Sequence, residues 1–179
     1  MNILFYVTGS AMAAMTPMSL LAISTFRPAD RVHVVLSRAA GKFVTGTACS
    51  LYAERLTMDD WDAMQNGEHV ELARWPDVIV VYPATLNFVT RLAAGLADTP
   101  VMQAIQCSTA PTIVAPGLPP GGAESYAFEQ ARKRLTEQHR ITLMPTVSAP
   151  SAALKMDMPG APAPIGEVLE LLDGISRTI

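Results

Sequence analysis

The feature that most constrains the fold is a run of five apolar residues from Val78 to Tyr82, which Pro83 ends. Consecutive apolar, mostly β-branched residues are typical of a strand that is buried on both faces, and such strands belong to parallel sheets. The segment that follows, from Leu86 to Leu96, has helical spacing of its apolar residues. The sequence therefore predicts a sheet that is covered by helices on both of its faces.

The rest of the chain repeats this alternation of short apolar runs and longer helical patterns. Thr16 and Pro17 supply an N-cap and a first-turn proline for a helix that Pro28 ends. This order predicts an α/β fold with a mostly parallel sheet and helices on both faces, and a ligand site beyond the carboxyl ends of the strands. The predicted strands are Ile3–Val7, Arg31–Leu36, Val78–Tyr82, Thr112–Ala115 and Ile141–Met144, and the predicted helices are Thr16–Arg27, Leu86–Leu96, Val101–Cys107, Glu124–Gln138 and Ile165–Ile179.

Three segments have a weaker pattern. Ser37 can cap a short helix that reaches Phe43, whereas the stretch from Thr45 to Ser50 is rich in Gly, Thr and Ser and is predicted to be a loop. The proline-rich segment from Pro145 to Pro164 is predicted to be irregular, either as a functional flap or as a linker to the last helix.

Composition limits the class of protein. The 179 residues show no shift in composition, which favours a single domain over 1–179. Half of the residues are hydrophobic and 16% are charged, which excludes a disordered chain and favours a closed oligomer that covers apolar surface. The net charge of −3 and the absence of a basic run argue against nucleic-acid binding.

The two cysteines and the N-terminal segment bear on the compartment. Cys49 and Cys107 are far apart and belong to no metal-binding motif, so neither a disulfide framework nor a zinc site is expected, and Cys107 is predicted to be a small core residue. The first residues carry no cationic segment and no long apolar stretch. We therefore expect a cytoplasmic protein without a membrane span.

Three predicted strand-to-helix junctions are rich in small and hydroxyl residues: 8–10, 37–39 and 83–87. Free N–H groups and hydroxyls at helix N-termini bind phosphate well, although each junction alone could be an ordinary N-cap. The sequence contains neither G-x-G-x-x-G nor G-x-x-x-x-G-K-[ST]. A mononucleotide cofactor such as FMN fits this pattern.

Histidine is the side chain that most often exchanges protons near neutral pH. His69 precedes the strongest strand and could act as a general base or hold a carboxylate, although on spacing alone a surface or capping role is commoner. His33, inside a strand, and His139, at a helix end, are expected to be structural.

Four segments together resemble the homo-oligomeric flavin-containing cysteine decarboxylases, and the likeness covers nearly the whole chain. The segments are Val7-Thr8-Gly9-Ser10, His69-Val70-Glu71-Leu72-Ala73-Arg74-Trp75-Pro76-Asp77, Pro83-Ala84-Thr85-Leu86-Asn87 and Ala94-Gly95-Leu96-Ala97-Asp98. This family includes phosphopantothenoylcysteine decarboxylase and the peptidyl-cysteine decarboxylases of epidermin-type peptide biosynthesis. The resemblance implies a Rossmann-like three-layer fold that assembles as trimers or as dodecamers built from trimers.

The resemblance also implies roles for particular residues. The FMN phosphate and its surroundings would be bound by Gly9, Ser10, Ser37 and Phe43. Thr85, Leu86 and Asn87 would approach the flavin ring, and His69 and Asn87 would be the catalytic residues. In such enzymes the cofactor oxidises the cysteine and the thioaldehyde that results loses carbon dioxide readily.

Two departures from the family pattern concern the substrate. The family has a Pro-Ala-Met-Asn stretch whose Asn helps to hold the substrate carboxylate. Here the corresponding residues are 116–122, and Pro119 cannot replace the side-chain amide of that Asn. Gly121 and Gly122 N–H groups, the Ser125 hydroxyl or Lys155 are the possible replacements. The flap at 145–164 also lacks the cysteine with which phosphopantothenoylcysteine decarboxylases reduce their intermediate.

A missing reductive cysteine favours the peptidyl-cysteine branch of the family. The predicted function is FMN-dependent oxidative decarboxylation of the C-terminal cysteine of a ribosomally made precursor peptide, as in lanthipeptide biosynthesis, to give an aminoenethiol. The alternatives are phosphopantothenoylcysteine decarboxylation in coenzyme A biosynthesis and a non-catalytic, flavin-binding regulatory subunit. The expected partners are the precursor peptide and further copies of the chain, without nucleic acid or membrane.

Overall fold

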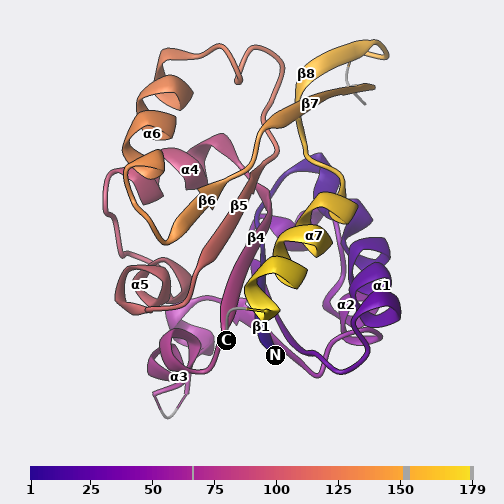
Figure 1. Ribbon diagram of the computed structural model, residues 1–179, viewed down its shortest axis with the longest axis vertical. Coiled ribbons are helices and arrows are strands. Elements are labelled where there is room, and N and C mark those ends of the chain that lie inside the picture. The colour runs from indigo at the N-terminus through magenta and orange to yellow at the C-terminus, as the bar shows by residue number, and fades with distance from the viewer. Residues whose placement is uncertain (66, 151–153, 178–179) are drawn as a thin grey trace.

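The fold is built on a six-stranded parallel sheet (Figure 1). The computed structural model describes residues 1–65, 67–150 and 154–177. All five pairs of neighbouring strands are parallel, which confirms the predicted α/β class. In spatial order the strands are β3 (Arg55–Asp59), β2 (Arg31–Ser37), β1 (Asn2–Val7), β4 (Val78–Ala84), β5 (Thr112–Pro116) and β6 (Ile141–Leu143).

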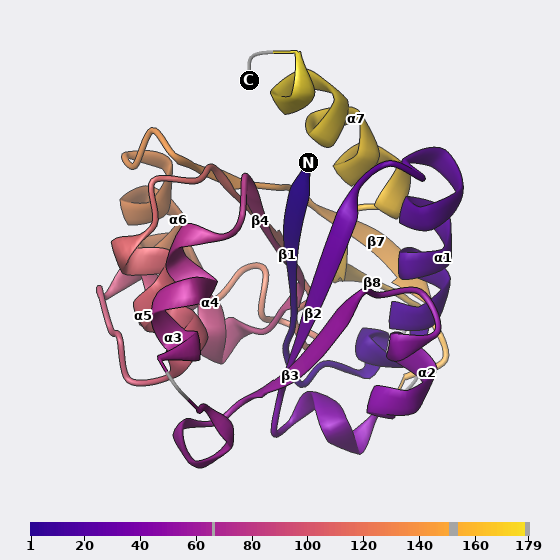
Figure 2. The same ribbon diagram turned by 90° about the horizontal axis from the view of Figure 1, so that it is seen from below.

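Helices cover both faces of this sheet, so that the molecule has three layers (Figure 2). In β1, Phe5 belongs to one core cluster and Leu4 to the other, because successive side chains of a strand point to opposite faces. One face packs against α1 (Thr16–Phe26), α2 (Gly46–Ser50) and α7 (Ile165–Ser176), and the other against α3 (Glu68–Arg74), α4 (Leu86–Ala93), α5 (Pro100–Cys107) and α6 (Tyr126–Thr136).

Three short 3-10 helices follow strand ends or lie in connections. They are η1 (Ala11–Met15), η2 (Ala40–Lys42) and η3 (Trp61–Ala63). The Ser37 hydroxyl accepts a hydrogen bond from the Ala40 N–H at 3.1 Å, but the N-cap of η2 is Ala39, which makes no side-chain capping bond. The predicted helix capped by Ser37 is therefore wrong, and a single 3-10 turn takes its place. No helix in the described part of the chain is long and apolar enough to cross a bilayer.

The prediction of a loop from Thr45 to Ser50 is wrong, because this stretch forms α2. The Thr45 hydroxyl accepts the Ala48 N–H at 3.2 Å, which is the hydrogen bond of a helix N-cap. Cys49 on this helix is fully buried. Thr45, a residue type that also favours turns, therefore caps a helix here. The packing of this short helix against the sheet stabilises the helix.

The prediction that 145–164 is irregular is also wrong for most of its described residues, and 151–153 lie outside the described part of the chain. β7 (Thr146–Pro150) and β8 (Asp157–Pro162) form an antiparallel two-stranded sheet with a register shift between Val147 and Ser148. The Leu118 N–H donates to the Gly160 carbonyl at 2.7 Å, which joins this hairpin to the loop after β5. The hairpin lies beyond the carboxyl end of the main sheet (Figure 1).

Two further expectations need correction. The polar strand β3 was not predicted, because four of its five residues are only half-buried at the edge of the sheet. Cys107, expected in the core, is exposed at the end of α5. Helix α7 ends at Ser176, and 178–179, where the predicted helix would continue, lie outside the described residues.

The ends of the two central strands are joined through the hydroxyl of Thr8. This hydroxyl donates to the Pro83 carbonyl at 2.7 Å and accepts the Thr85 N–H at 2.8 Å. The backbone N–H of Thr8 also donates to Pro83, at 3.2 Å. Thr8 is almost completely buried, so one side chain fixes the turn after β1 against the turn after β4.

We predict that Thr8→Val destabilises the protein by about 1–3 kcal/mol at nearly constant volume, because it leaves the half-buried Thr85 N–H without its partner and removes one of the two hydrogen bonds that the Pro83 carbonyl accepts. Urea unfolding would measure the change. Thr112→Val is the matched control, since the Thr112 hydroxyl is buried without a hydrogen-bond partner among the described residues. This second substitution should be neutral or stabilising, and equal losses in the two variants would contradict the role of Thr8.

Candidate functional site

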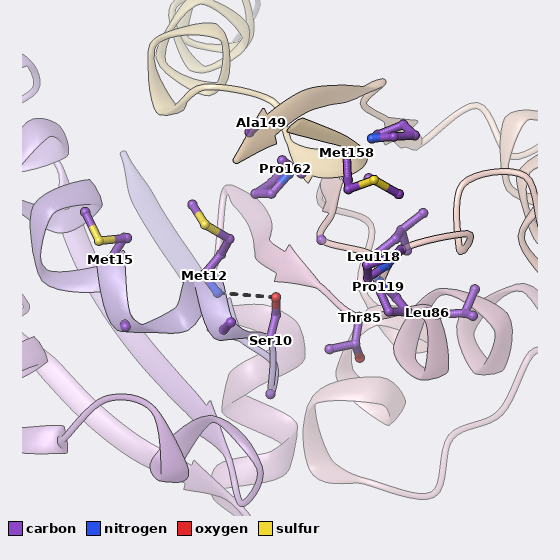
Figure 3. Close-up of a pocket in the computed structure, with 18 of the residues that line it drawn as sticks. Ser10, Met12, Met15, Thr85, Leu86, Leu118, Pro119, Ala149, Met158 and Pro162 are labelled. Atoms are coloured by element: carbon purple, nitrogen blue, oxygen red, sulfur yellow. Dashed lines mark hydrogen bonds between the residues drawn. The ribbon is translucent and has the colours of Figure 1, made fainter. Parts of the chain in front are cut away.

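A cavity of about 680 Å³ lies beyond the carboxyl ends of β1, β4 and β5, beneath the hairpin of β7 and β8 (Figure 3). Ligands of open parallel sheets bind at this edge where the strand order reverses, here between β1 and β4. The lining residues described by the structure are Gly9, Ser10, Ala11, Met12, Ala14, Met15, Thr85, Leu86, Asn87, Gly117, Leu118, Pro119, Pro120, Ala149, Pro150, Met158, Pro159, Gly160, Ala161 and Pro162.

Glycines allow the chain turns around the cavity to approach closely. A Cβ atom on Gly9 would lie 2.3 Å from the Cβ atom of Ala39, so only glycine lets the turn after β1 contact the turn after β2. A Cβ atom on Gly117 would lie 2.9 Å from Pro83 and 3.2 Å from the Ser10 hydroxyl oxygen. The junctions after β1, β2, β4 and β5 therefore meet at one place.

The start of α4 presents donors to the cavity. Thr85 is the N-cap, and its hydroxyl accepts the Phe88 N–H at 3.3 Å. The N–H groups of Leu86 and Asn87 occupy the first two positions of the helix, where no partner exists within the helix. Asn87 is exposed and adds its carboxamide to this edge of the cavity.

Of the predicted cofactor residues, the structure brings Gly9, Ser10, Thr85, Leu86 and Asn87 together around the cavity. The Ser10 hydroxyl accepts the Met12 N–H at 3.4 Å and so begins η1.

Ser37 and Phe43 lie in the neighbouring turn rather than in the lining. They flank Ala39, which touches Gly9, and the Phe43 ring is exposed. This turn is therefore adjacent to the cavity and contributes no lining residue in the described part of the chain.

The predicted substrate residues lie outside the described lining of the cavity. The Gly122 N–H donates to the Pro119 carbonyl at 2.8 Å, and Ser125 donates to the Gly122 carbonyl at 2.7 Å while capping α6. Gly121 has a φ of +77° at an exposed turn, and Lys155 is exposed near the end of the hairpin. Gly122 and Ser125 thus already hold local partners.

His69 is on α3, away from the described lining of the cavity. Its ring meets the edge of Trp61, with centroids 5.6 Å apart, and the Trp61 indole N–H donates to the Asp98 carbonyl at 3.0 Å. Asn87 therefore lines the cavity, whereas His69 is not among its described lining residues.

The buried carboxylate of Asp59 does not line the cavity but holds elements that border it. The Tyr6 hydroxyl donates to Asp59 at 2.6 Å, and the other carboxylate oxygen of Asp59 accepts the Val101 N–H at 3.0 Å. Burial, together with the Asp59 charge, raises the pKa of Tyr6 well above its usual value. The Tyr6 ring packs against Phe88 of α4, which fixes the helix whose start borders the cavity.

Reasoning from the sequence missed the apolar walls of the cavity. Met12 and Met15 come from η1, Leu118 and Pro119 from the loop after β5, and Met158 from β8 (Figure 3). The uncharged stretch from Ala11 to Phe26 was a signal for the first wall. No local pattern in the sequence predicted that the distant hairpin of β7 and β8 would form the second apolar wall.

Comparison with known proteins gives the family. The family model described as Flavoprotein matches residues 1–177. The chain belongs to the flavoprotein family. This membership confirms the resemblance drawn from the sequence and the predicted flavin cofactor.

Two relatives are similar over part of the chain. Cypemycin cysteine dehydrogenase (decarboxylating) of Streptomyces sp is 32% identical over 117 residues, which are 64% of this chain and 62% of that protein. The coenzyme A biosynthesis bifunctional protein CoaBC of Borreliella burgdorferi is 36% identical over 87 residues, which are 48% of this chain and 22% of that protein. The chain thus spans less than two thirds of either relative.

Solved structures share the fold. A PPC decarboxylase mutant complexed with pantothenoylaminoethenethiol superimposes with a TM-score of 0.83 at 22% identity, covering 98% of both chains. The FMN-dependent cysteine decarboxylase TvaF from thioviridamide biosynthesis gives a TM-score of 0.71 at 25% identity, covering 80% of this chain and 88% of that one.

The residues around the cavity fit a flavin. The close contact that Gly9 permits places two turns side by side, and backbone N–H groups at such turns bind phosphate without a lysine. The apolar lining suits a planar aromatic ring, and Ser10, Thr85 and Asn87 would be available for its polar contacts.

His33, buried in β2 as predicted for a structural histidine, generates a pH prediction. Burial lowers its pKa to about 4, and the positive charge of Arg55 adds to the effect. The unfolded chain, with a histidine pKa near 6.5, binds the proton more readily. Stability present above pH 6.5 should therefore be lost as the pH falls toward 4, by at most about 1.4 kcal/mol per pH unit.

Urea unfolding between pH 7 and pH 4.5 would measure this loss. His33→Gln keeps a group able to hydrogen-bond with the Thr57 hydroxyl, which lies 3.0 Å from the ring nitrogen of His33. The variant should show a shallower fall than the parent protein. Identical pH profiles would mean that His33 titrates alike in the folded and unfolded states.

Proposed function

We propose that this protein is an FMN-dependent decarboxylase of a C-terminal peptidyl cysteine. The observation that carries the proposal is a cavity at the switch point of a flavoprotein-family sheet, closed by a hairpin whose sequence contains no cysteine. Cys49 and Cys107 are outside the described lining as well. A thiol that could reduce the intermediate is therefore not among the described residues around the site.

The proposed reaction is oxidative. The peptide loses carbon dioxide and two hydrogens, and the product is an aminoenethiol. FMN supplies the two-electron oxidation when it is bound. An external oxidant, such as dioxygen, must accept these two electrons before the next turnover. The chain itself supplies the binding site, the orientation of the cysteine and the exclusion of water.

Each candidate residue has a place in this proposal. Gly9 and Ser10 hold the phosphate end of the cofactor, with Ser37 and Phe43 from the adjacent turn. Thr85 and Leu86 border the flavin ring. Asn87, whose carboxamide is on the same edge, orients the reacting cysteine.

The hairpin over 145–164 is proposed to be the substrate flap. It is joined to the rest of the cavity through one backbone hydrogen bond, from Leu118 to Gly160, and by the lining residues of β8. Lys155 is the cation on this flap and can approach a peptide carboxylate when the flap closes. Gly121 can offer an N–H group, whereas Gly122 and Ser125 would first have to leave their present partners.

Self-association is part of the proposal. Helix α1 carries no charged residue, yet Met18, Leu21 and Phe26 are exposed on it. An apolar helix of this kind is normally covered by protein. A trimer, or a multiple of three, would cover it, and a neighbouring copy could bring His69 to the cavity. Light scattering of the purified protein tests this assembly.

The decisive experiment is the mass change of a peptide that ends in cysteine. We predict that the purified protein is yellow, releases FMN on denaturation and removes about 46 Da from the peptide, which is carbon dioxide plus two hydrogens. A peptide that ends in serine is the control and should stay unchanged.

The alternatives give different results in the same experiment. Loss of about 44 Da from phosphopantothenoylcysteine, without change in any peptide, would replace the proposal by decarboxylation without net oxidation. A yellow protein that changes neither compound would support a regulatory flavoprotein.

We predict that His69→Asn keeps its flavin but loses decarboxylation by about 10²- to 10⁴-fold, the usual contribution of a general base. His139→Asn, at an exposed turn after α6, is the control and should have little effect. Full activity of a folded, yellow His69→Asn protein would leave His69 with a structural role beside Trp61.

Mixing two inactive variants tests whether copies share the site. If His69 serves a neighbouring cavity, His69→Asn and Asn87→Ala subunits unfolded and reassembled together should regain about a quarter of the activity, the fraction expected from random mixing across shared boundaries. No recovery would mean that both residues serve the same chain.

A further inference from the structure

Trp61 is the aromatic neighbour of His69, which occupies the second position of α3. The planes of the two rings are inclined by 62°, an arrangement that aromatic pairs prefer. Within the described residues, no hydrogen bond reaches the imidazole nitrogens of His69. The contact with Trp61 therefore holds the imidazole without occupying the two atoms that can exchange a proton.

The indole of Trp61 is itself fixed, although 44% of the residue is exposed. Its N–H donates to the Asp98 carbonyl at 3.0 Å, and the Asp98 carboxylate forms an ion pair with Arg91 of α4. The same helix presents Asn87 at its start. One helix thus borders the cavity at its first turn and holds the neighbour of His69 near its last turn.

The backbone that carries Trp61 is also held. Asp59, two residues earlier, accepts the Val101 N–H at the start of α5. Asp60 caps η3 by accepting the Asp62 N–H at 3.2 Å, and its other carboxylate oxygen lies 2.6 Å from the Arg38 guanidinium. The turn therefore keeps the indole at one position beside α3.

A fixed neighbour matters for a histidine that moves a proton. Without such a contact, an imidazole can occupy about six orientations, from three χ1 wells and two settings of the ring. A general base acts only when its nitrogen is within hydrogen-bond reach of the proton that it removes. A contact that selects one orientation can therefore raise the productive fraction by up to about sixfold.

We propose that Trp61 is a positioning residue, which keeps the His69 imidazole in the orientation used in the reaction, and that Asp98 and Arg91 fix the indole for this purpose. The inference rests on the proposed function, because it takes His69 as a group that acts on the substrate. Trp61 is not among the described lining residues of the cavity, so it acts through His69.

The first test is kinetic. Trp61→Leu removes the ring and its N–H, so the kcat for mass loss from the cysteine peptide should fall about 3- to 10-fold, while KM changes less than about twofold. Trp61→Phe restores a ring beside His69 and should have a kcat at least about twice that of Trp61→Leu. A Trp61→Phe protein no faster than Trp61→Leu would contradict a role for the ring contact.

The second tryptophan of the chain gives a matched control. Trp75 meets the ring of His33 with centroids 5.8 Å apart and planes inclined by 76°, and neither residue is among the described lining residues of the cavity. Trp75→Leu removes the same kind of contact and should leave the kcat of the folded protein within about twofold of the parent value. Equal losses of kcat in Trp61→Leu and Trp75→Leu would overturn the inference.

A double variant tests whether Trp61 acts through His69. In a His69→Asn protein no imidazole remains to be positioned, so adding Trp61→Leu should cause no further loss of kcat. A further loss of about threefold or more would show that Trp61 supports the reaction by another route, and the inference would be rejected.

Nuclear magnetic resonance separates this inference from the proposed reaction. Labelling with ¹³C-histidine gives ring signals for the three histidines of the chain, which His33→Gln, His69→Asn and His139→Asn assign. Trp61→Leu should move the His69 signals, because the ring current of the indole shifts nearby nuclei, whereas Trp75→Leu should move those of His33. A parent protein that changes no peptide would refute the proposed function alone. His69 signals that Trp61→Leu leaves in place would refute the inference, with or without turnover.

Discussion

The hydroxyl of Thr8 is the contact on which the geometry of the site depends. By donating to Pro83 and accepting from Thr85, it joins the ends of the two strands between which the order of the sheet reverses. The two turns that border the cavity are therefore fixed relative to one another before any ligand binds. The close approach that Gly9 allows adds the turn after β2 to the same unit.

Much of the fold could be predicted from the sequence because its strongest signals are local. The apolar run at β4 and the helix α1, with its proline in the first turn, need only the pattern of a few residues. The predicted N-cap of α1 is wrong, because Thr16 lies inside the helix and the N-cap is Met15, which makes no side-chain capping bond. β3 and the hairpin could not be predicted in this way. β3 is polar and is held by pairing with β2, while the proline-rich β8 depends on β7 and on the distant contact of Gly160 with Leu118.

Some residues of the candidate site could likewise be predicted from local sequence, and others could not. Gly9, Ser10 and Thr85 lie at junctions whose small and hydroxyl residues are visible in the sequence, and the cavity is where such junctions meet. The apolar walls are assembled from η1, the loop after β5 and β8, which are distant in the sequence, so no local pattern reveals them. His69 illustrates a further limit, since its proposed role depends on where a second copy lies.

The residues of these walls explain how an apolar surface can be built from loop segments. A buried backbone N–H requires a partner, and proline removes this requirement while it also fixes the backbone. Pro119, Pro159 and Pro162 therefore form a rigid apolar surface without N–H groups that need partners. The neighbouring N–H groups of Gly117 and Leu118 already donate to the carbonyls of Ala84 and Gly160. Met12 and Met158 then supply the adaptable part of the surface. In this arrangement the backbone sets the shape of the cavity, and the methionines can adjust to the ligand that enters it.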